Sequence, residues 1–381
     1  MLHTLPGFRH AAINTVILFL AALGGAHAAW GANDIVIGQS MDFSQTSGVR
    51  LKEFSRGVDA FIDHVNVSGG IKGRKIKLIR YDDQFKPDKA LENAKKLVEV
   101  DKVDVLFALG SAPNFSAILP YATQAGVPVF GAISGADSIR RFNPLAFHYR
   151  ASFSDEINRI VQHVSGVGIT SIAVLAVDLP IGKDGLAALN VASKAGGSTL
   201  KVVASEKIPQ DLQGLDAAVT KVVNVSPATI LILGPSGPSI KFIEALKKTA
   251  TTAQIFVLSV VSSDALVAKF GEAARGIVIT QVVPYPWVAN TKLVKDYQDL
   301  MNQTSGTISV DSMEGYLAAR MLIEGIRASG ASFSRKGFIS ALEKWNGKDM
   351  DGYTISFSEK DHVASSYVDI TMIGRKGRLV R

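Results

Sequence analysis

The chain has 381 residues, of which 47% are hydrophobic and 20% charged, and its formal net charge is +7. This composition is typical of a soluble globular protein and argues against both wholesale disorder and a polytopic membrane protein. The chain has no cysteine, which excludes disulfide bonds, thiolate catalysis and cysteine-ligated metal centres. At about 100 to 200 residues per domain, the length favours two domains.

Residues 1–28 have the features of a secretory signal peptide. They contain one arginine, no acidic residue and an apolar run over 11–23 that is short for a hydrocarbon layer of ~30 Å. Ala26, His27 and Ala28 then form a small-x-small cleavage signature. We expect cleavage near Ala28 and a soluble mature protein outside the cytoplasm. An uncleaved anchor helix is the alternative, which the glycines after the run disfavour.

Short, nearly continuous apolar runs are predicted to be strands. They lie at 103–109, 171–177, 229–233, 255–258 and 276–280 and are rich in Val, Ile, Leu and Phe. Such runs are typical of parallel strands that helices cover on both faces. The mature chain therefore has at least this set of buried strands.

Amphipathic segments alternate with these runs and are predicted to be helices. Apolar residues recur with helical spacing in 58–65, 91–98 and 157–164, and a long helical stretch follows at 311–328. The third of these helices is predicted to be capped near Ser154 and Asp155. This alternation predicts an α/β fold with right-handed βαβ crossovers and a mostly parallel, doubly wound sheet. More than ten such units favour two sheets and therefore two lobes.

Catalytic and metal-binding signatures are sparse. None of the histidines in the mature chain belongs to an i, i+4 pair with a catalytic glutamate, so we predict no metal and no cofactor. Gly234-Pro235-Ser236-Gly237 superficially resembles a nucleophile elbow, but its second glycine comes one residue early. An exported α/β hydrolase is therefore kept only as an alternative. Basic residues are interspersed with acidic ones, so we expect no nucleic-acid partner.

Two strand-to-helix turns carry small and hydroxyl residues. Gly110 to Asn114 follows the strand at 103–109, and Ser134 to Asp137 follows an apolar run at 127–132. In doubly wound sheets, ligands bind outside the carboxyl ends of the strands, where helix N-termini can hold an anion. Two such turns together can bind one carboxylate group of a ligand. The alternative is that Ser111 and Ser134 merely cap helices.

Five segments together resemble the leucine/isoleucine/valine-binding-protein type of periplasmic solute receptor, which serves ABC importers. The segments are Ile35 to Gln39, Gly69 to Asp83, Gly126 to Phe130, Tyr149 to Glu156 and Ala274 to Pro284. The resemblance runs in order along essentially the whole mature chain. The GlyGlyIle-x-Gly-Arg to TyrAspAsp block at 69–83 is fairly specific.

The resemblance implies two Rossmann-like lobes of the type I periplasmic binding fold that close over one small solute. It places crossings between the lobes near Arg150, Val283 and Gly352. Lobe one is then 34–150 plus 284–352, and lobe two is 151–283 plus 353–381. It further implies no enzymatic activity, a periplasmic location, an ABC permease in the inner membrane as partner, and a monomer.

The resemblance also implies where the solute binds. The candidate ligand-binding residues are Phe43, Ser111, Ala112, Ile133, Ser134, Gly135, Phe153, Ile181 and Ser259. In such receptors an acid at the position of Ser259 meets the ligand ammonium, and an aromatic residue stands near the position of Ile181. This chain departs from the family at both positions, so the ligand class stays open between an amino acid, a carboxylate and an amide. A periplasmic ligand sensor that feeds a signalling receptor is a further alternative to transport.

Overall fold

The computed structural model describes Met1 and residues 34–44, 48–195, 198–330 and 333–381. Apart from Met1, the predicted signal peptide at 1–28 lies outside the described residues. Residues 35–381 form one compact unit. No helix in the described ranges is long and apolar enough to cross a membrane.

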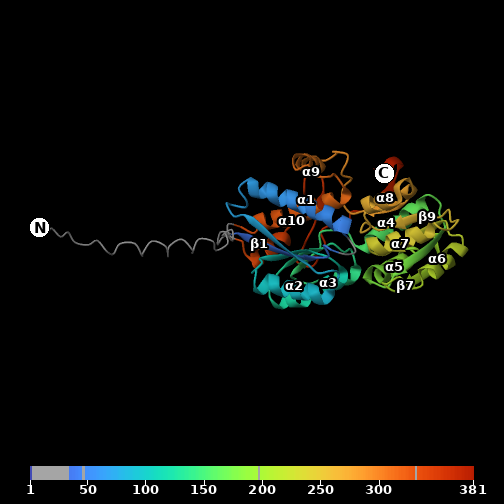
Figure 1. The fold of residues 1–381 in the computed structure, drawn as a ribbon, viewed down its shortest axis with the longest axis horizontal. Coiled ribbons are helices and arrows are strands. Elements are labelled where there is room, and N and C mark those ends of the chain that lie inside the picture. Colours follow the sequence, from blue (N-terminus) through green and yellow to red (C-terminus); the bar gives the residue numbers. More distant parts are fainter. Residues whose placement is uncertain (2–33, 45–47, 196–197, 331–332) are drawn as a thin grey trace. The chain divides into compact units, whose positions relative to one another are not determined.

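The first sheet consists of five parallel strands in the order β2-β1-β3-β4-β5. Its strands are β1 (Ile35–Met41), β2 (Ile76–Asp82), β3 (Val105–Leu109), β4 (Val129–Ala132) and β5 (Ala146–Phe147). Helices α1 (Gly48–Val67) and α10 (Val310–Ala328) cover one face, and α2 (Pro87–Glu99) and α3 (Ala112–Gln124) cover the other (Figure 1). We call this sheet with its helices lobe one.

The second sheet has seven strands in the order β14-β13-β10-β9-β8-β6-β7. Its strands are β6 (Ser171–Val177), β7 (Lys201–Ile208), β8 (Thr229–Leu233), β9 (Gln254–Val257), β10 (Val278–Gln281), β13 (Asp369–Ile373) and β14 (Leu379–Val380). The first five strands pair in parallel and repeat the order of lobe one, whereas β13 and β14 add antiparallel strands at one edge. We call this sheet with its helices lobe two.

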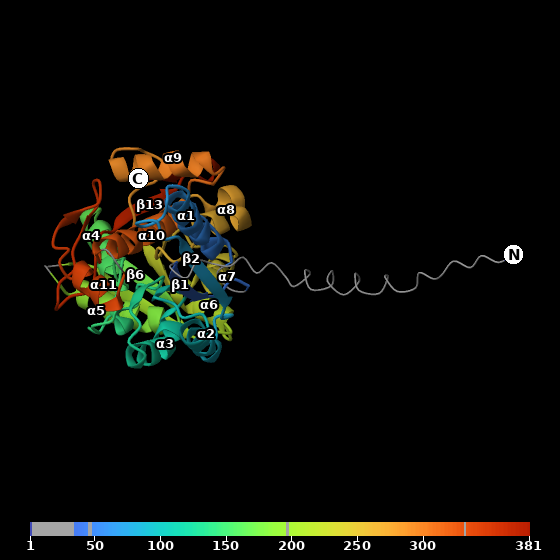
Figure 2. The same ribbon diagram turned by 90° about the vertical axis from the view of Figure 1, so that its left-hand side faces the viewer.

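The helices of lobe two are α4 (Phe153–Gly166), α5 (Pro180–Ala192), α6 (Leu215–Asn224), α7 (Ser236–Leu246) and α8 (Ser263–Phe270). Helix α9 (Lys292–Gln303) lies beside α1, as Figures 1 and 2 both show. Helix α11 (Arg335–Leu342) packs on α10, and β11 (Lys348–Asp349) pairs with β12 (Thr354–Ile355). Short 3₁₀ helices are η1 (Asp137–Ile139), η2 (Gly271–Ala274) and η3 (Arg375–Gly377).

Proline and hydroxyl residues set where several helices begin. Proline occupies the first turn of α2, α3 and α5, where its fixed φ suits the helix and its missing N–H costs nothing. Helix α4 begins with a capping box in which Ser152 and Asp155 satisfy each other's backbone N–H groups. The cap predicted near Ser154 and Asp155 has its N-cap two residues before Ser154, at Ser152, and Asp155 takes part in it from the third helical position.

Helices α1 and α10 cross in direct backbone contact at two glycines. A Cβ atom added to Gly57 would lie 1.9 Å from the carbonyl oxygen of Ser312, and one added to Gly315 would lie 1.9 Å from that of Phe54. Neither position leaves room for any other residue. The close crossing brings Arg50 in the first turn of α1 next to Asp311 and Glu314 of α10.

The predicted α/β class and the predicted buried strands are confirmed. The runs at 171–177 and 229–233 are strands with those bounds, and the other predicted strands shift by one or two residues at one or both ends. The predicted lobe boundaries stay a prediction. Phe357 and Ala364 pack in the core of lobe one, and His148 forms an isolated β-bridge with Val363. These contacts favour a third crossing between Ala364 and β13, later in the chain than the predicted position near Gly352.

Candidate functional site

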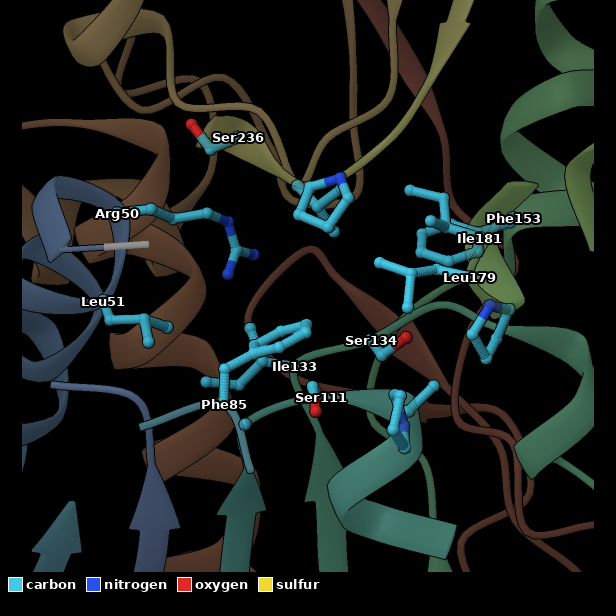
Figure 3. Close-up of a pocket in the computed structure, with 16 residues that line it drawn as sticks. Arg50, Leu51, Phe85, Ser111, Ile133, Ser134, Phe153, Leu179, Ile181 and Ser236 are labelled. Carbon is cyan, nitrogen blue, oxygen red and sulfur yellow. The ribbon is translucent and has the colours of Figure 1, made fainter. Parts of the chain in front are cut away.

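A pocket between the two lobes lies at the carboxyl ends of the parallel strands of both sheets (Figure 3). It encloses about 540 Å³ of space free of protein atoms, part of it open to solvent. Lobe one contributes Arg50, Leu51, Phe85, Gly110, Ser111, Ala112, Pro113, Ile133 and Ser134, and lobe two contributes Phe153, Leu179, Pro180, Ile181, Pro235, Ser236 and Val260. This is the position at which doubly wound sheets bind small molecules.

Five helices begin at this pocket. The lining residues include Arg50 in the first turn of α1, Ser111 at the start of α3, Phe153 in α4, Pro180 in α5 and Ser236 in α7. The first N–H groups of a helix lack intrahelical partners, and the helix dipole places partial positive charge there. The convergence of helix N-termini from both lobes favours a negatively charged ligand group.

The two predicted serines lie on adjacent turns of the pocket wall. Ser111 Oγ accepts a hydrogen bond from Asn114 N at 3.3 Å and thereby caps α3, and Ser134 Oγ accepts one from Ala136 N at 3.2 Å. Each hydroxyl uses a lone pair in these bonds and keeps its proton for another acceptor. Capping and ligand contact are therefore compatible at both positions.

The remainder of the lining is largely apolar. Leu51, Phe85 and Ile133 from lobe one lie opposite Phe153 and Ile181 from lobe two (Figure 3). Ala112 lines the pocket as well. The pocket therefore offers an apolar body for a ligand together with a few polar groups, as small-molecule sites generally do.

Arg50 is the one cationic side chain among the described residues that line the pocket, and no acidic side chain lines it. Its guanidinium extends into the space between the lobes (Figure 3). Nη2 lies 2.5 Å from Glu314 Oε2, and Nε lies 3.5 Å from Asp311 Oδ1, both on α10. Burial raises the pKa of Asp311 to about 7, although Arg50 opposes the shift.

Ser259, predicted at the place of an ammonium-binding acid, does not line the pocket. It is buried behind the pocket, where its N donates to Glu156 Oε2 and its Oγ donates to Glu156 Oε1, each at 2.8 Å. Glu156 also accepts hydrogen bonds from Thr280 Oγ1 and, at 3.0 Å, from Arg150 Nη2. The acid nearest to this position is thus fully engaged with protein groups.

Arg150 connects this buried cluster to the pocket wall. Its Nη1 donates to the carbonyl oxygen of Ile133 at 2.7 Å and to Glu314 Oε1 at 3.1 Å. Tyr149 Oη also donates to Glu314 Oε1, at 2.9 Å. Because Glu314 binds Arg50 as well, one continuous set of buried ion pairs supports the turn at Ile133 and the guanidinium at the pocket.

Two other predicted residues lie outside the pocket lining. Phe43 lines a separate groove beside the first half of α1. Gly135 supports the pocket from behind, because its carbonyl oxygen accepts a hydrogen bond from Phe153 N at 2.6 Å. A Cβ atom at Gly135 would lie 2.8 Å from Phe153 Cδ1, so the glycine allows that ring to reach the pocket.

Several lining residues were not predicted from the sequence. Ser236 follows β8 just as Ser111 follows β3, so the rule that found Ser111 also applies to it. Leu179 and Pro180 follow β6 in the same way. Arg50 has no comparable signal, because it lies in the first turn of a helix whose sequence shows only an amphipathic pattern.

The fold and the pocket define a two-lobed solute-binding protein of the type I periplasmic class, which has no enzymatic activity. Residues 34–378 match the model of a family described as periplasmic binding protein, and the chain belongs to that family. The likeness to receptors of the leucine/isoleucine/valine-binding type that the sequence indicated is thereby confirmed.

Individual relatives cover nearly the whole chain. The Leu/Ile/Val-binding protein homolog 7 of Brucella suis biovar 1 is 24% identical over 371 residues, which cover 91% of this chain and 90% of that protein. The crystal structure of an extracellular ligand-binding receptor from Verminephrobacter eiseniae is 29% identical, has a TM-score of 0.85, and covers 91% of this chain and 100% of its own. The crystal structure of a possible leucine/isoleucine/valine-binding protein from Rhodopirellula baltica is 26% identical and has a TM-score of 0.82. The match covers 91% of this chain and 96% of that protein's chain.

Proposed function

We propose that this protein is the periplasmic receptor of an ABC importer and that its solute carries a carboxylate and no α-ammonium group. The family is one of periplasmic binding proteins, and relatives along nearly the whole chain bear the name Leu/Ile/Val-binding protein. The observation that carries the ligand class is the polarity of the pocket: five helices begin at it, Arg50 is paired with Glu314 and Asp311 behind it, and no acid is among the described lining residues.

The carboxylate is expected to bind between the turns at Ser111 and Ser134. Both hydroxyls keep a proton to donate, and the N-terminus of α3 adds positive potential at the same place. The apolar remainder of the solute then packs against Phe85, Phe153 and Ile181.

An α-ammonium group finds no counter-charge in this arrangement. Burying an unpaired ammonium is expensive, and a receptor for an amino acid needs a carboxylate that is free to meet it. Glu156 is committed to Arg150, Ser259 and Thr280. Glu314 is bound to Arg50, Tyr149 and Arg150. A carboxylate without an amino group is therefore the better match.

Two measurements test this proposal. Native mass spectrometry of protein purified from periplasmic extract identifies any retained solute. Titration calorimetry then compares a matched series, for instance 4-methylpentanoate, leucine and 4-methylpentanamide, or the corresponding series built on the retained solute. We expect the carboxylate to bind at least about tenfold more tightly than either other compound, since one charge-assisted contact contributes about 1.5 kcal/mol or more. Tighter binding of the amino acid would refute the ligand class.

The export and transport parts of the proposal have their own tests. N-terminal sequencing of the periplasmic protein should show cleavage near Ala28, and the mature protein should appear in the soluble fraction. A strain that lacks the gene should lose high-affinity uptake of the identified solute. Unchanged uptake together with a lost transcriptional response to the solute would instead support the sensor alternative.

A further inference from the structure

A second cluster of basic side chains surrounds a small cavity at the edge of lobe one, next to β5. The cavity holds about 320 Å³ of space free of protein atoms, part of it open to solvent. Its lining includes Arg140, Arg141, His148, Lys360 and His362. It shares no residue with the lining of the ligand pocket, so it is a separate feature of the fold.

Arg140 uses only part of its hydrogen-bonding capacity. Nη2 donates to the carbonyl oxygens of Arg150 and Ala151 at 2.9 and 3.0 Å. Nε and Nη1 are buried and have no hydrogen-bond partner among the described residues. An unsatisfied donor on a buried charged group is costly, so these two N–H positions call for an acceptor.

Three carboxylates interact with Arg140 through their charge, and each also binds another protein group. Asp137 Oδ2 accepts from Ser154 N at 3.1 Å, Asp155 forms the capping box of α4, and Glu156 is paired with Arg150. Burial and the neighbouring Arg150 lower the pKa of Arg140 to about 10, which leaves it charged at neutral pH. These carboxylates act on Arg140 through their charge, but its Nε and Nη1 have no hydrogen-bond partner among the described residues.

Two buried histidines complete the cavity. His148 and His362 are each 3% exposed. His148 Nδ1 has no partner among the described residues, and its ring lies near Phe115. His362 Nδ1 lies 3.1 Å from the carbonyl oxygen of Ala146, and its Nε2 lies 3.4 Å from Glu343 Oε1. Burial, reinforced by Arg140 and His362, lowers the pKa of His148 to about 3.

Basic side chains outnumber acidic ones around the cavity. Asp361 is the one acidic residue among the described residues that line it, against Arg140, Arg141 and Lys360, and its Oδ1 accepts a hydrogen bond from Val363 N at 3.0 Å. Arg141 and Lys360 are exposed at the rim and add positive charge there. The guanidinium of Arg140 keeps N–H donors at Nε and Nη1 without a partner, and a charged N–H donor suits an oxygen of a phosphate or sulfate ion.

We infer that this cavity binds a small inorganic oxyanion, phosphate or sulfate, on Arg140 and His148, with Arg141 and Lys360 at the entrance. The site would be distinct from the solute pocket. Because Arg140 also binds the carbonyl oxygens of Arg150 and Ala151, the anion would restrain the segment that connects β5 to α4. It would thereby stiffen one connection between the lobes.

The test uses the mature protein in a low-salt buffer free of phosphate and sulfate, titrated separately with sodium phosphate and sodium sulfate. NMR spectra of the histidine rings report the site directly, with His64 and His163 as internal controls. We expect saturable shifts of the His148 and His362 signals and a matching saturable rise in the thermal unfolding midpoint. The variants Arg141→Gln and His148→Phe should each weaken binding about tenfold. Arg378→Gln, which removes an exposed arginine elsewhere, should not.

Sulfate and phosphate also stabilise proteins nonspecifically by exclusion from the surface, an effect that does not saturate and that the variants would share. A purely linear rise in the midpoint, with unmoved His148 and His362 signals, would overturn the inference and mean that water fills the cavity. Saturable binding that both site variants leave unchanged would overturn it as well, because the anion would then bind elsewhere. Saturation by only one of the two anions supports the site and identifies its ligand.

Discussion

Replacement of Asp311 by asparagine should remove a pH-dependent part of the protein's stability. Asp311 is 2% exposed, accepts a hydrogen bond from Ser262 Oγ at 2.8 Å, and lies 3.5 Å from Arg50 Nε. Glu314 and Asp264 add repulsion. An asparagine keeps an oxygen for Ser262 and cannot ionise, so the substitution isolates the effect of the charge.

The sign of the effect follows from the two pKa values. Burial raises the pKa of Asp311 in the folded protein to about 7, whereas an unfolded aspartate titrates near 3.9. Between these values the folded state binds more protons than the unfolded state, so the free energy of unfolding falls as pH rises. The contribution is complete below about pH 4 and is lost as pH rises through about 7. Between pH 5 and pH 8 the loss amounts to about 2 to 3 kcal/mol.

The measurement is urea unfolding of both proteins at several pH values from 5 to 8, followed by circular dichroism and tryptophan fluorescence. Many groups contribute to the pH slope of either protein, so the informative quantity is the difference between the slopes. Wild type should lose about 2 to 3 kcal/mol more than Asp311→Asn over this range. Asp63→Asn, which alters an exposed aspartate of α1, serves as the control and should follow wild type. Parallel curves for wild type and Asp311→Asn would refute the reasoning.

Three further predictions concern the pocket, the helix crossing and the hinge. Ser111→Ala and Ser134→Ala should each weaken binding of the identified carboxylate by about 1.5 to 3 kcal/mol, roughly tenfold to over a hundredfold. If the hydroxyls only cap helices, calorimetry will show unchanged affinity, and denaturation will show that stability falls by ~1 kcal/mol. Gly57→Ala and Gly315→Ala should each destabilise the protein by about 1 to 3 kcal/mol or more, because the new Cβ meets backbone at 1.9 Å, whereas Gly166→Ala, with nothing within 4 Å, should not. Addition of the identified solute should reduce the radius of gyration measured by small-angle X-ray scattering, and an unchanged radius with confirmed binding would argue against hinge closure.

Local pattern in the sequence was enough to predict the architecture. The runs at 171–177 and 229–233 are strands with the predicted bounds, because a strand buried on both faces needs apolar residues at every position. The same reasoning placed Ser111 and Ser134 at the pocket, since chain that leaves a parallel strand must emerge at the carboxyl edge of the sheet. The family resemblance added further residues that also line it: Ala112, Ile133, Phe153 and Ile181.

The charges of the site were decided by tertiary structure alone. Arg50 meets Glu314, which lies 264 residues away in the chain, because two glycines let α1 and α10 cross in contact. Glu156 meets Ser259 across 103 residues, so the acid near that position comes from another element and is already satisfied. Sequence spacing carries no information on such pairs. Coulomb energy and desolvation depend on distance in space and on burial, and both are set only when the helices and sheets pack.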